Sequence, residues 1–338
     1  MVEWGMLLAP MLVAAVAAGP VCKIDDKRMD ELSGLVATDD GYVVVNDGAD
    51  EASHRKIFYL KKDCSVRRTV SYPSRPRDTE DLQLGPDGTL WVADIGDNGA
   101  SRDTIALWKV APGSSKPKLY RMSYPDGAHD AEALIIAPDG TPVIVTKTPG
   151  AAGVYVPTGA LKPGGTTVLK PVGSVSVPIT TTSNPYSFPG RMVITGAATS
   201  PDRTRVVLRT YADAFEYDVS GGDVVKALTS GTPKQIPLPD EPQGESVAYT
   251  VDGTALLTVS EGTKPTLLRY PLPDPPAPVK SPPPVVAGSP GPSPAVAAAK
   301  SSSSALPLYV FLFAAFGIGI PVAAVLVRRF RRRTGRPR

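Results

Sequence analysis

Histidine and cysteine are scarce in this 338-residue chain, which contains two of each. The two histidines, His54 and His129, are too few for a histidine-rich metal site, and no Ser–His–Asp arrangement is evident in the sequence. Two cysteines cannot form a four-cysteine metal cluster, and no glycine-rich phosphate loop occurs in the sequence. Any chemistry is therefore expected from carboxylate, hydroxyl and amino groups.

Positive charge gathers at one end of the chain. Seven arginines fall between residues 328 and 338, whereas residues 21–270 hold 27 Lys and Arg against 31 Asp and Glu. The central part is slightly acidic even though the whole chain has a formal net charge of +3. Such a surface does not attract a phosphate backbone, so we expect no nucleic-acid partner.

An uncharged segment precedes these arginines. Residues 306–327 form a run of 22 residues without a charged side chain, and a helix of roughly 20 apolar residues spans a bilayer. Arginines on one flank place that flank in the cytoplasm. The sequence thus predicts a single-pass helix at 306–327, an Arg-rich cytoplasmic tail at 328–338, and a cell-membrane location with the N-terminal domain outside.

The other end of the chain resembles an export signal. An apolar run from Met6 to Ala18 predicts a signal peptide over 1–18. An uncleaved N-terminal anchor is the alternative, because Glu3 stands where Lys or Arg is usual. Residues 272–305 are rich in Pro, Ser and Ala and predict an extended stalk. This leaves residues 21–271 as the folded ectodomain.

The two cysteines, Cys22 and Cys64, both lie in the predicted ectodomain. An even pair in an oxidising compartment predicts one disulfide, with a free buried pair as the alternative. Closing a loop of this length contributes about 3–4 kcal/mol to stability. We therefore expect a disulfide bond between Cys22 and Cys64.

Five segments of the ectodomain share one pattern: a polar residue, a short apolar strand, a turn with Asp and usually Gly, and a second apolar strand. Their first residues are 47, 52, 63 and 50 positions apart, which is the length of a four-stranded propeller blade. Asp-Gly turns favour hairpins. The sequence predicts an all-β propeller of five blades, with six as the alternative. Residues 21–28 are expected to supply the fourth strand that the last repeat lacks.

The first residues of the repeats are the candidate metal ligands. In a propeller the innermost strands line a central channel, so this one position converges on the axis from every blade. Carboxylates and hydroxyls suit Ca²⁺ better than zinc, and converging glutamates repel unless a cation or protons compensate them. Solvated glutamates that bind only water are the alternative. The predicted axial ligands are Ser33, Glu80, Glu132, Thr195 and Glu245.

This order of axial residues resembles the calcium ring of the five-bladed calcium-activated nucleotidases, the apyrases, which have Ser where Thr195 stands. The resemblance implies a calcium ion on the axis. The stretch from Asp94 to Asn98 and the Glu-Asp-Leu and Glu-Ser-Val repeat starts look like those of uncharacterised exported, membrane-anchored propellers of high-GC Gram-positive bacteria. Those proteins are distantly similar to phytase-like and TolB/WD40-like propellers.

A second polar layer lies where the second strands of the repeats end. Mixed charge at one rim can hold a polar or anionic ligand, although Asp and Asn also serve turns by bonding their own backbone. The candidate rim residues are Asp47, Asp94, Asp97, Asn98, Lys147, Arg209 and Glu261.

Two functions fit these observations. The first, which the sequence favours, is a non-enzymatic binding or scaffold module on the cell surface, with a structural calcium ion and an extracellular ligand or protein partner. The alternative is a calcium-dependent hydrolase of phosphate esters, nucleotides or lactones that uses the carboxylates at the channel mouth.

Overall fold

The computed structural model describes residues 18–239 and 241–273, which belong to one compact unit. The predicted membrane helix and tail lie outside these residues, as do nearly all of the predicted signal peptide and stalk. Within the described part, the model contains no helix that is long and apolar enough to cross a membrane.

The described chain is almost entirely β-structure, and its antiparallel sheets follow the predicted repeats. The first sheet, in the order β2-β3-β4-β5, comprises Leu32–Thr38, Gly41–Asn46, Lys56–Lys61 and Val66–Ser71. Another, β14-β15-β16-β17, comprises Gly196–Thr199, Arg205–Arg209, Asp213–Asp218 and Lys234–Pro237. Two short helices, α1 (Ser187–Gly190) and α2 (Val224–Ser230), flank strands of this second sheet.

An eight-stranded sheet holds the second and third repeats. Strands β6 to β9 are Asp81–Leu84, Leu90–Asp94, Ile105–Val110 and Lys118–Ser123. Strands β10 to β13 are Ala131–Ile136, Pro142–Thr146, Ala151–Pro157 and Thr166–Ser176. The two sets join at their outer strands, where β13 pairs with β9 in parallel. Every other pairing in this sheet is antiparallel.

The last sheet combines the two ends of the described chain. Its order is β1-β20-β19-β18, with β18 (Gly244–Tyr249), β19 (Ala255–Ser260), β20 (Thr266–Pro271) and β1 (Gly19–Lys23). Strand β1 pairs antiparallel with β20. The prediction that the N-terminal segment completes the last repeat is therefore confirmed, with the strand at 19–23 rather than 21–28.

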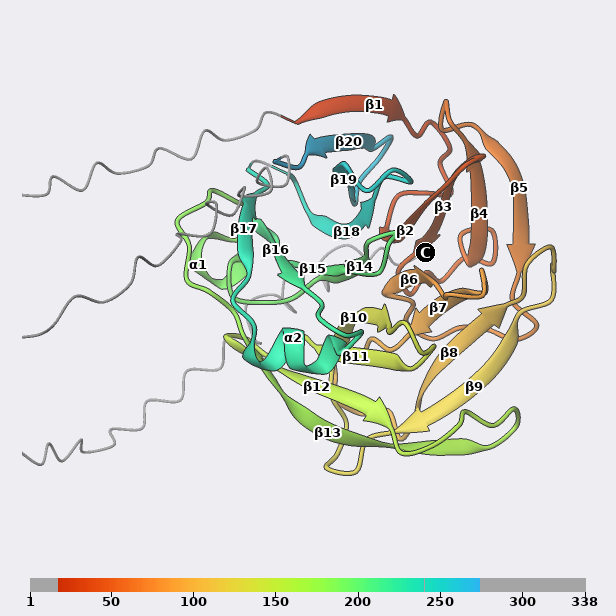
Figure 1. Ribbon diagram of the computed structural model, residues 1–338. Helices are drawn as coiled ribbons and strands as arrows, with labels where there is room; N and C mark the ends of the chain where they lie inside the picture. Colours follow the sequence, from red (N-terminus) through yellow and green to blue (C-terminus); the bar gives the residue numbers. More distant parts are fainter. Residues whose placement is uncertain (1–17, 240, 274–338) are drawn as a thin grey trace, which may run out of the picture. The chain divides into compact units, whose positions relative to one another are not determined.

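The sheets are arranged around a common centre (Figure 1), with β2, β6, β10, β14 and β18 innermost. These innermost strands also contact one another in turn: β2 contacts β6 and β18, β10 contacts β6 and β14, and β14 contacts β18. The outer strands of the sheets lie at the periphery of Figure 1. This arrangement is an all-β, propeller-like fold, as the sequence predicts.

The hydrophobic core is divided into layers between neighbouring sheets. Trp108 packs with Val45 and Leu82 in the layer between the first two repeats, and Trp91 packs with Leu134 in the next layer. Tryptophans bury large apolar areas, which explains their use here. Further layers fill the remaining junctions. The sheets are thus held face to face by apolar side chains.

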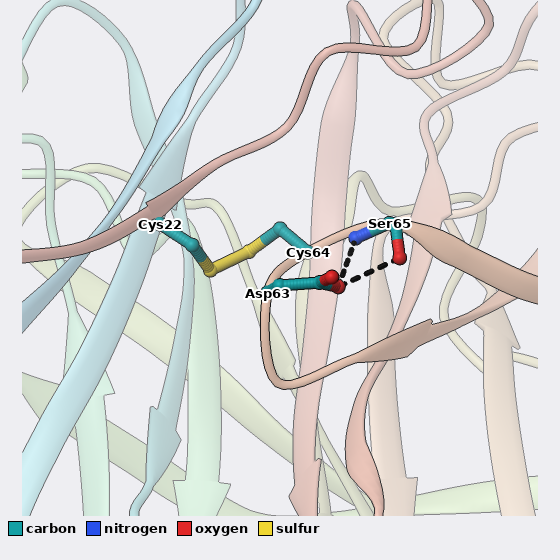
Figure 2. The surroundings of a disulfide bond; sticks show 4 residues. All are labelled: Cys22, Asp63, Cys64 and Ser65. Atoms are coloured by element: carbon teal, nitrogen blue, oxygen red, sulfur yellow. Dashed lines mark hydrogen bonds between the residues drawn. A yellow bond between two sulfur atoms is a disulfide. The ribbon is translucent and has the colours of Figure 1, made fainter.

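Figure 2 shows the predicted disulfide between Cys22 and Cys64. Cys22 lies in β1, which belongs to the last sheet, and Cys64 lies in the turn between β4 and β5 of the first sheet. Asp63 holds this turn by accepting hydrogen bonds from the backbone N–H and the hydroxyl of Ser65, at 3.0 and 2.6 Å. The covalent bond therefore connects the first and last sheets.

Candidate cation site at the axis

Three glutamates converge where the innermost strands begin. Glu80 directly precedes β6, while Glu132 and Glu245 occupy the second positions of β10 and β18. Their exposed fractions are 1%, 3% and 4%. Because the innermost strands contact one another around the axis, these buried carboxyl groups influence each other electrostatically. The structure therefore brings the three glutamates together at neighbouring strand ends, and their role as metal ligands stays a prediction.

A tighter group of carboxylates includes one of these glutamates. Oxygens of Asp47, Asp78 and Glu80 lie within 4.8 Å of one another. Asp47 directly follows β3, and Asp78 lies in the loop that leads to β6. Three carboxylate oxygens at this separation are a donor set for a hard divalent cation. Because Asp47 and Asp78 are half-buried, the group remains open to solvent on one side.

Two glycines let the backbone approach this group. A Cβ atom on Gly96 would overlap Glu80 Oε1 and lie 2.7 Å from Asp78 Oδ2. A Cβ atom on Gly48 would likewise overlap Asp78 Oδ1. Only a residue without a side chain fits at either position while the carboxylates keep their places. The glycines that follow β3 and β7 therefore leave room for the acidic group.

The electrostatics of the group favour protons or a cation. Burial raises the pKa of Asp47 and of Glu80 well above the usual range, and the neighbouring carboxylates raise them further. Burial also raises the pKa of Asp78. It raises the pKa of Glu261 to about 11, with help from the charge of Glu245. Carboxyl groups with raised pKa values gain most when a bound cation compensates their charge.

One ammonium group compensates part of this charge. Lys147 follows β11, and its Nζ donates to Glu132 Oε1 and, at 3.3 Å, to the hydroxyl of Tyr211. Burial opposes its charge, but Glu132 raises the pKa of Lys147 well above the usual value. The Tyr211 hydroxyl in turn donates to Glu245 Oε1 at 3.1 Å. Gln243 Nε2 donates to the same oxygen at 3.2 Å.

Glu132 keeps one oxygen free inside this network. Its Oε2 is buried and has no hydrogen-bond partner among the described residues, whereas Oε1 is held by Lys147. Burial raises the pKa of Glu132 to about 8, even though Lys147 lowers it. A buried acceptor without a partner costs free energy. The oxygen is therefore positioned for a group that the protein itself does not provide, such as a cation, a water molecule or a substrate proton.

The two predicted hydroxyl ligands are used in backbone contacts. Ser33 Oγ donates to the main-chain oxygen of Glu80 at 2.6 Å, and Thr195 Oγ1 donates to that of Gly244 at 3.1 Å. Both hydroxyls thereby link neighbouring innermost strands. Their role as metal ligands stays a prediction.

The predicted rim residues separate into two groups. Asp47, Lys147 and Glu261 lie at the acidic network, with Glu261 accepting from Gln243 Nε2. Others serve the scaffold: Asp94 pairs with Arg102 at 2.9 Å, Asp97 accepts from the backbone of Ser101 and Arg102, and Arg209 binds Glu241. Asn98 is exposed in the turn between β7 and β8.

Sequence reasoning missed Asp78, Gln243 and two tyrosines. Asp78 lies two residues before Glu80, so the acidic run from 78 to 81 was a signal that could have identified it. Tyr186 stacks at a tilt on Tyr211, with ring centroids 4.5 Å apart, and donates to Gln243 at 2.7 Å. Tyr186 comes from the long segment between β13 and β14, which no repeat pattern covers.

No family model and no curated protein matches this chain. Solved structures do match it at 11% identity. A virginiamycin B lyase from Staphylococcus aureus covers 72% of this chain and 67% of its own length, with a TM-score of 0.37. A streptogramin B lyase matches 75% of this chain over 97% of its own length, with a TM-score of 0.40. A glucose dehydrogenase matches 76% of this chain over 99% of its own length, with a TM-score of 0.41.

These comparisons correct one expectation. The sequence favoured a module without enzymatic activity, but all three of these structures are enzymes by name. The preference for a non-enzymatic module is therefore wrong. At this level of identity the likeness concerns the fold, and it assigns no substrate to the present chain.

Proposed function

We propose that the chain is an exported, membrane-anchored propeller of five blades that binds a divalent cation, Ca²⁺ first, and hydrolyses an ester or a phosphoanhydride bond. The substrate classes that suit this chemistry are phosphate esters, nucleotides and lactones. The observation that carries the proposal is the acidic group at the axis, together with the unpartnered Oε2 of Glu132.

The five-blade count is supported by the contacts of the innermost strands. Each of β2, β6, β10, β14 and β18 contacts the next, and the chain of contacts returns from β18 to β2. The eight-stranded sheet then counts as two blades, β6–β9 and β10–β13, whose strands pair with each other at the outer β13–β9 junction. The layered cores between neighbouring sheets are consistent with this division.

The cation is proposed to bind Asp47, Asp78 and Glu80. Oxygen-only ligands favour Ca²⁺ over zinc, and the half-buried positions of Asp47 and Asp78 leave the group accessible from solvent. A bound divalent cation would lower the pKa of a water ligand and polarise a carbonyl or phosphoryl oxygen. Ser33, Thr195, Glu132 and Glu245 remain proposed as further axial ligands or as groups that orient them.

The chain's own groups have separate roles in this proposal. Glu132 is the candidate general base, because its Oε2 is free. With a pKa of about 8 it acts as a base in its deprotonated fraction, which grows as the pH rises toward 8. Lys147 is the candidate group that stabilises negative charge developing on the substrate, since its ammonium lies at the same network. Tyr211 connects Lys147 to Glu245 and so fixes the position of both.

The location is proposed from the sequence. An uncharged segment at 306–327 followed by arginines supports a single-pass anchor, and the disulfide suits an oxidising compartment. The membrane is then the one partner that the chain itself implies. The substrate would be met outside the cytoplasm, at the distance from the membrane that residues 272–305 allow.

The experiment measures hydrolysis by the full chain, purified in detergent, with p-nitrophenyl phosphate, ATP and γ-butyrolactone as probes. We expect turnover of at least one probe with Ca²⁺ and its loss with chelator. Glu132→Gln should lower kcat by about 10²-fold or more, whereas Glu51→Gln, at an exposed side chain on the surface, should leave it unchanged. Turnover that survives chelation, or equal rates in the Glu132→Gln variant and the unchanged chain, would contradict the proposal.

A further inference from the structure

A hollow lies at the ends of the innermost strands, opposite to the acidic group. It has a volume of about 380 Å³, within the range of small-molecule sites. The residues around it come from the ends of β2, β6, β14 and β18 and from the turns that follow them. The innermost strands begin at the acidic group, so this hollow is the other mouth of the same axis.

Arg203 gives this mouth its charge. The other four repeats have glycine at the corresponding turn position, and Gly88, Gly140 and Gly253 have φ values of 74°, 86° and 68°. Arg203 adopts the same left-handed conformation, with φ of 59°. This conformation is unfavourable for a residue with a side chain. The turn alone would therefore favour glycine, so the arginine needs another reason.

The guanidinium of Arg203 extends from its turn toward two other innermost strands. It donates to the main-chain oxygens of Leu84, at 3.1 Å, and of Ile136, at 3.4 Å. A guanidinium has five N–H groups, so these two contacts leave three available. Arg203 is half-buried, and among the residues that the structure describes it forms no ion pair. Burial lowers the pKa of the Arg203 guanidinium, while the carboxylate of Asp87, which is near but not paired with it, acts to raise that pKa. A partly buried cation without an ion-pair partner attracts an anion.

The walls around this cation are mixed. Leu84, Pro86, Pro201 and Val251 supply apolar surface, and Val251 is 46% exposed. Thr199 also lines the hollow, and its hydroxyl oxygen is buried with no hydrogen-bond partner among the described residues. A ligand that fits has an apolar body for the walls and an anionic head for the guanidinium.

We propose that this mouth of the axis is a binding site for a small organic carboxylate with an apolar body, held by Arg203. A carboxylate matches the planar fork of the guanidinium through two parallel hydrogen bonds. Inorganic phosphate offers the charge without the apolar body and should bind more weakly. The site is independent of the acidic group, because it shares none of that group's residues.

Calorimetry on the full chain in detergent tests this site, with benzoate as the probe and benzyl alcohol and inorganic phosphate as comparisons. We expect one benzoate site per chain and weaker binding of both other probes. A hydrogen bond to a charged group is worth about 1.5–3 kcal/mol, so Arg203→Gly should weaken benzoate binding about 10- to 100-fold. Glycine is the residue that the other turns use, so this variant should fold.

Two more variants make the result specific. Arg203→Lys keeps the charge but loses the fork, and it should retain part of the affinity. Asp39→Asn removes an exposed carboxylate from the rim of the hollow and should strengthen benzoate binding. The proposal is overturned if benzoate does not bind, if benzyl alcohol binds as tightly as benzoate, or if Arg203→Gly leaves the affinity unchanged while the variant remains folded.

Discussion

Removing the disulfide between Cys22 and Cys64 tests how the first and last sheets are held together. The two cysteines are 42 residues apart in the sequence, and closing a loop of that length restricts the unfolded chain by about 4 kcal/mol. For a domain of this size, each kcal/mol changes the melting temperature by about 2–4 °C. The variant Cys22→Ser/Cys64→Ser should therefore melt about 8–16 °C lower than the unchanged chain.

Circular dichroism of both forms, with and without a thiol reductant, measures this difference. Reductant should lower the melting temperature of the unchanged chain toward that of the double variant and should leave the double variant as it is. Strand β1 is otherwise held by its backbone pairing with β20, so the native sheets should still form at low temperature. A decrease in melting temperature of less than about 2 °C in both comparisons would refute the view that this disulfide stabilises the junction between the first and last sheets.

Three further outcomes follow from the site and its scaffold. Gly96→Ala should abolish calcium-induced stabilisation in a thermal melt, because its Cβ would overlap Glu80. Gly99→Ala, at an open position, should retain that stabilisation. Equal behaviour of the two variants would contradict the role of the close approach between Gly96 and Glu80. Asp94→Asn leaves the buried Arg102 without its counter-charge and should cost about 3–5 kcal/mol in urea unfolding; an unchanged unfolding midpoint would count against a structural role for Asp94. Glu132, with its pKa raised to about 8, holds a proton in the folded apo protein that the unfolded chain, titrating near 4.5, has already released. Apo stability should thus fall as pH rises from about 4.5 to 8, while calcium should stabilise more at pH 8 than at pH 6; the opposite trend would refute the assignment.

The repeat pattern was sufficient to predict most of the architecture. Hairpin turns such as the one at Gly88 carry local information, because only a few residues tolerate positive φ. The alignment of these turns also predicts that Glu80, Glu132 and Glu245 lie at the axis. The fourth strand of the last sheet followed from counting strands, although its limits shifted to residues 19–23.

The detailed site depended on contacts that no repeat encodes. Asp78 approaches Glu80 because the loop before β6 folds back over the strand end, where Asp94 accepts hydrogen bonds from the backbone of residues 77 and 78. Asp94 was therefore a scaffold residue, although its position suggested a ligand. Tyr186 comes from an irregular segment whose path is set by tertiary packing. Side chains of these kinds converge only once the chain has folded.

The central claim is that the acidic group at the axis binds a divalent cation. Titration calorimetry of the full chain with Ca²⁺, in detergent at pH 8, tests it most directly when the unchanged chain is compared with Asp78→Asn and with Asp87→Asn. Asp87 is exposed in a turn far along the strand from the group, so it is the matched control. The account predicts one calcium site per chain, lost or weakened at least tenfold in Asp78→Asn and retained in Asp87→Asn. Absence of binding to the unchanged chain, or equal affinity in all three proteins, would contradict it.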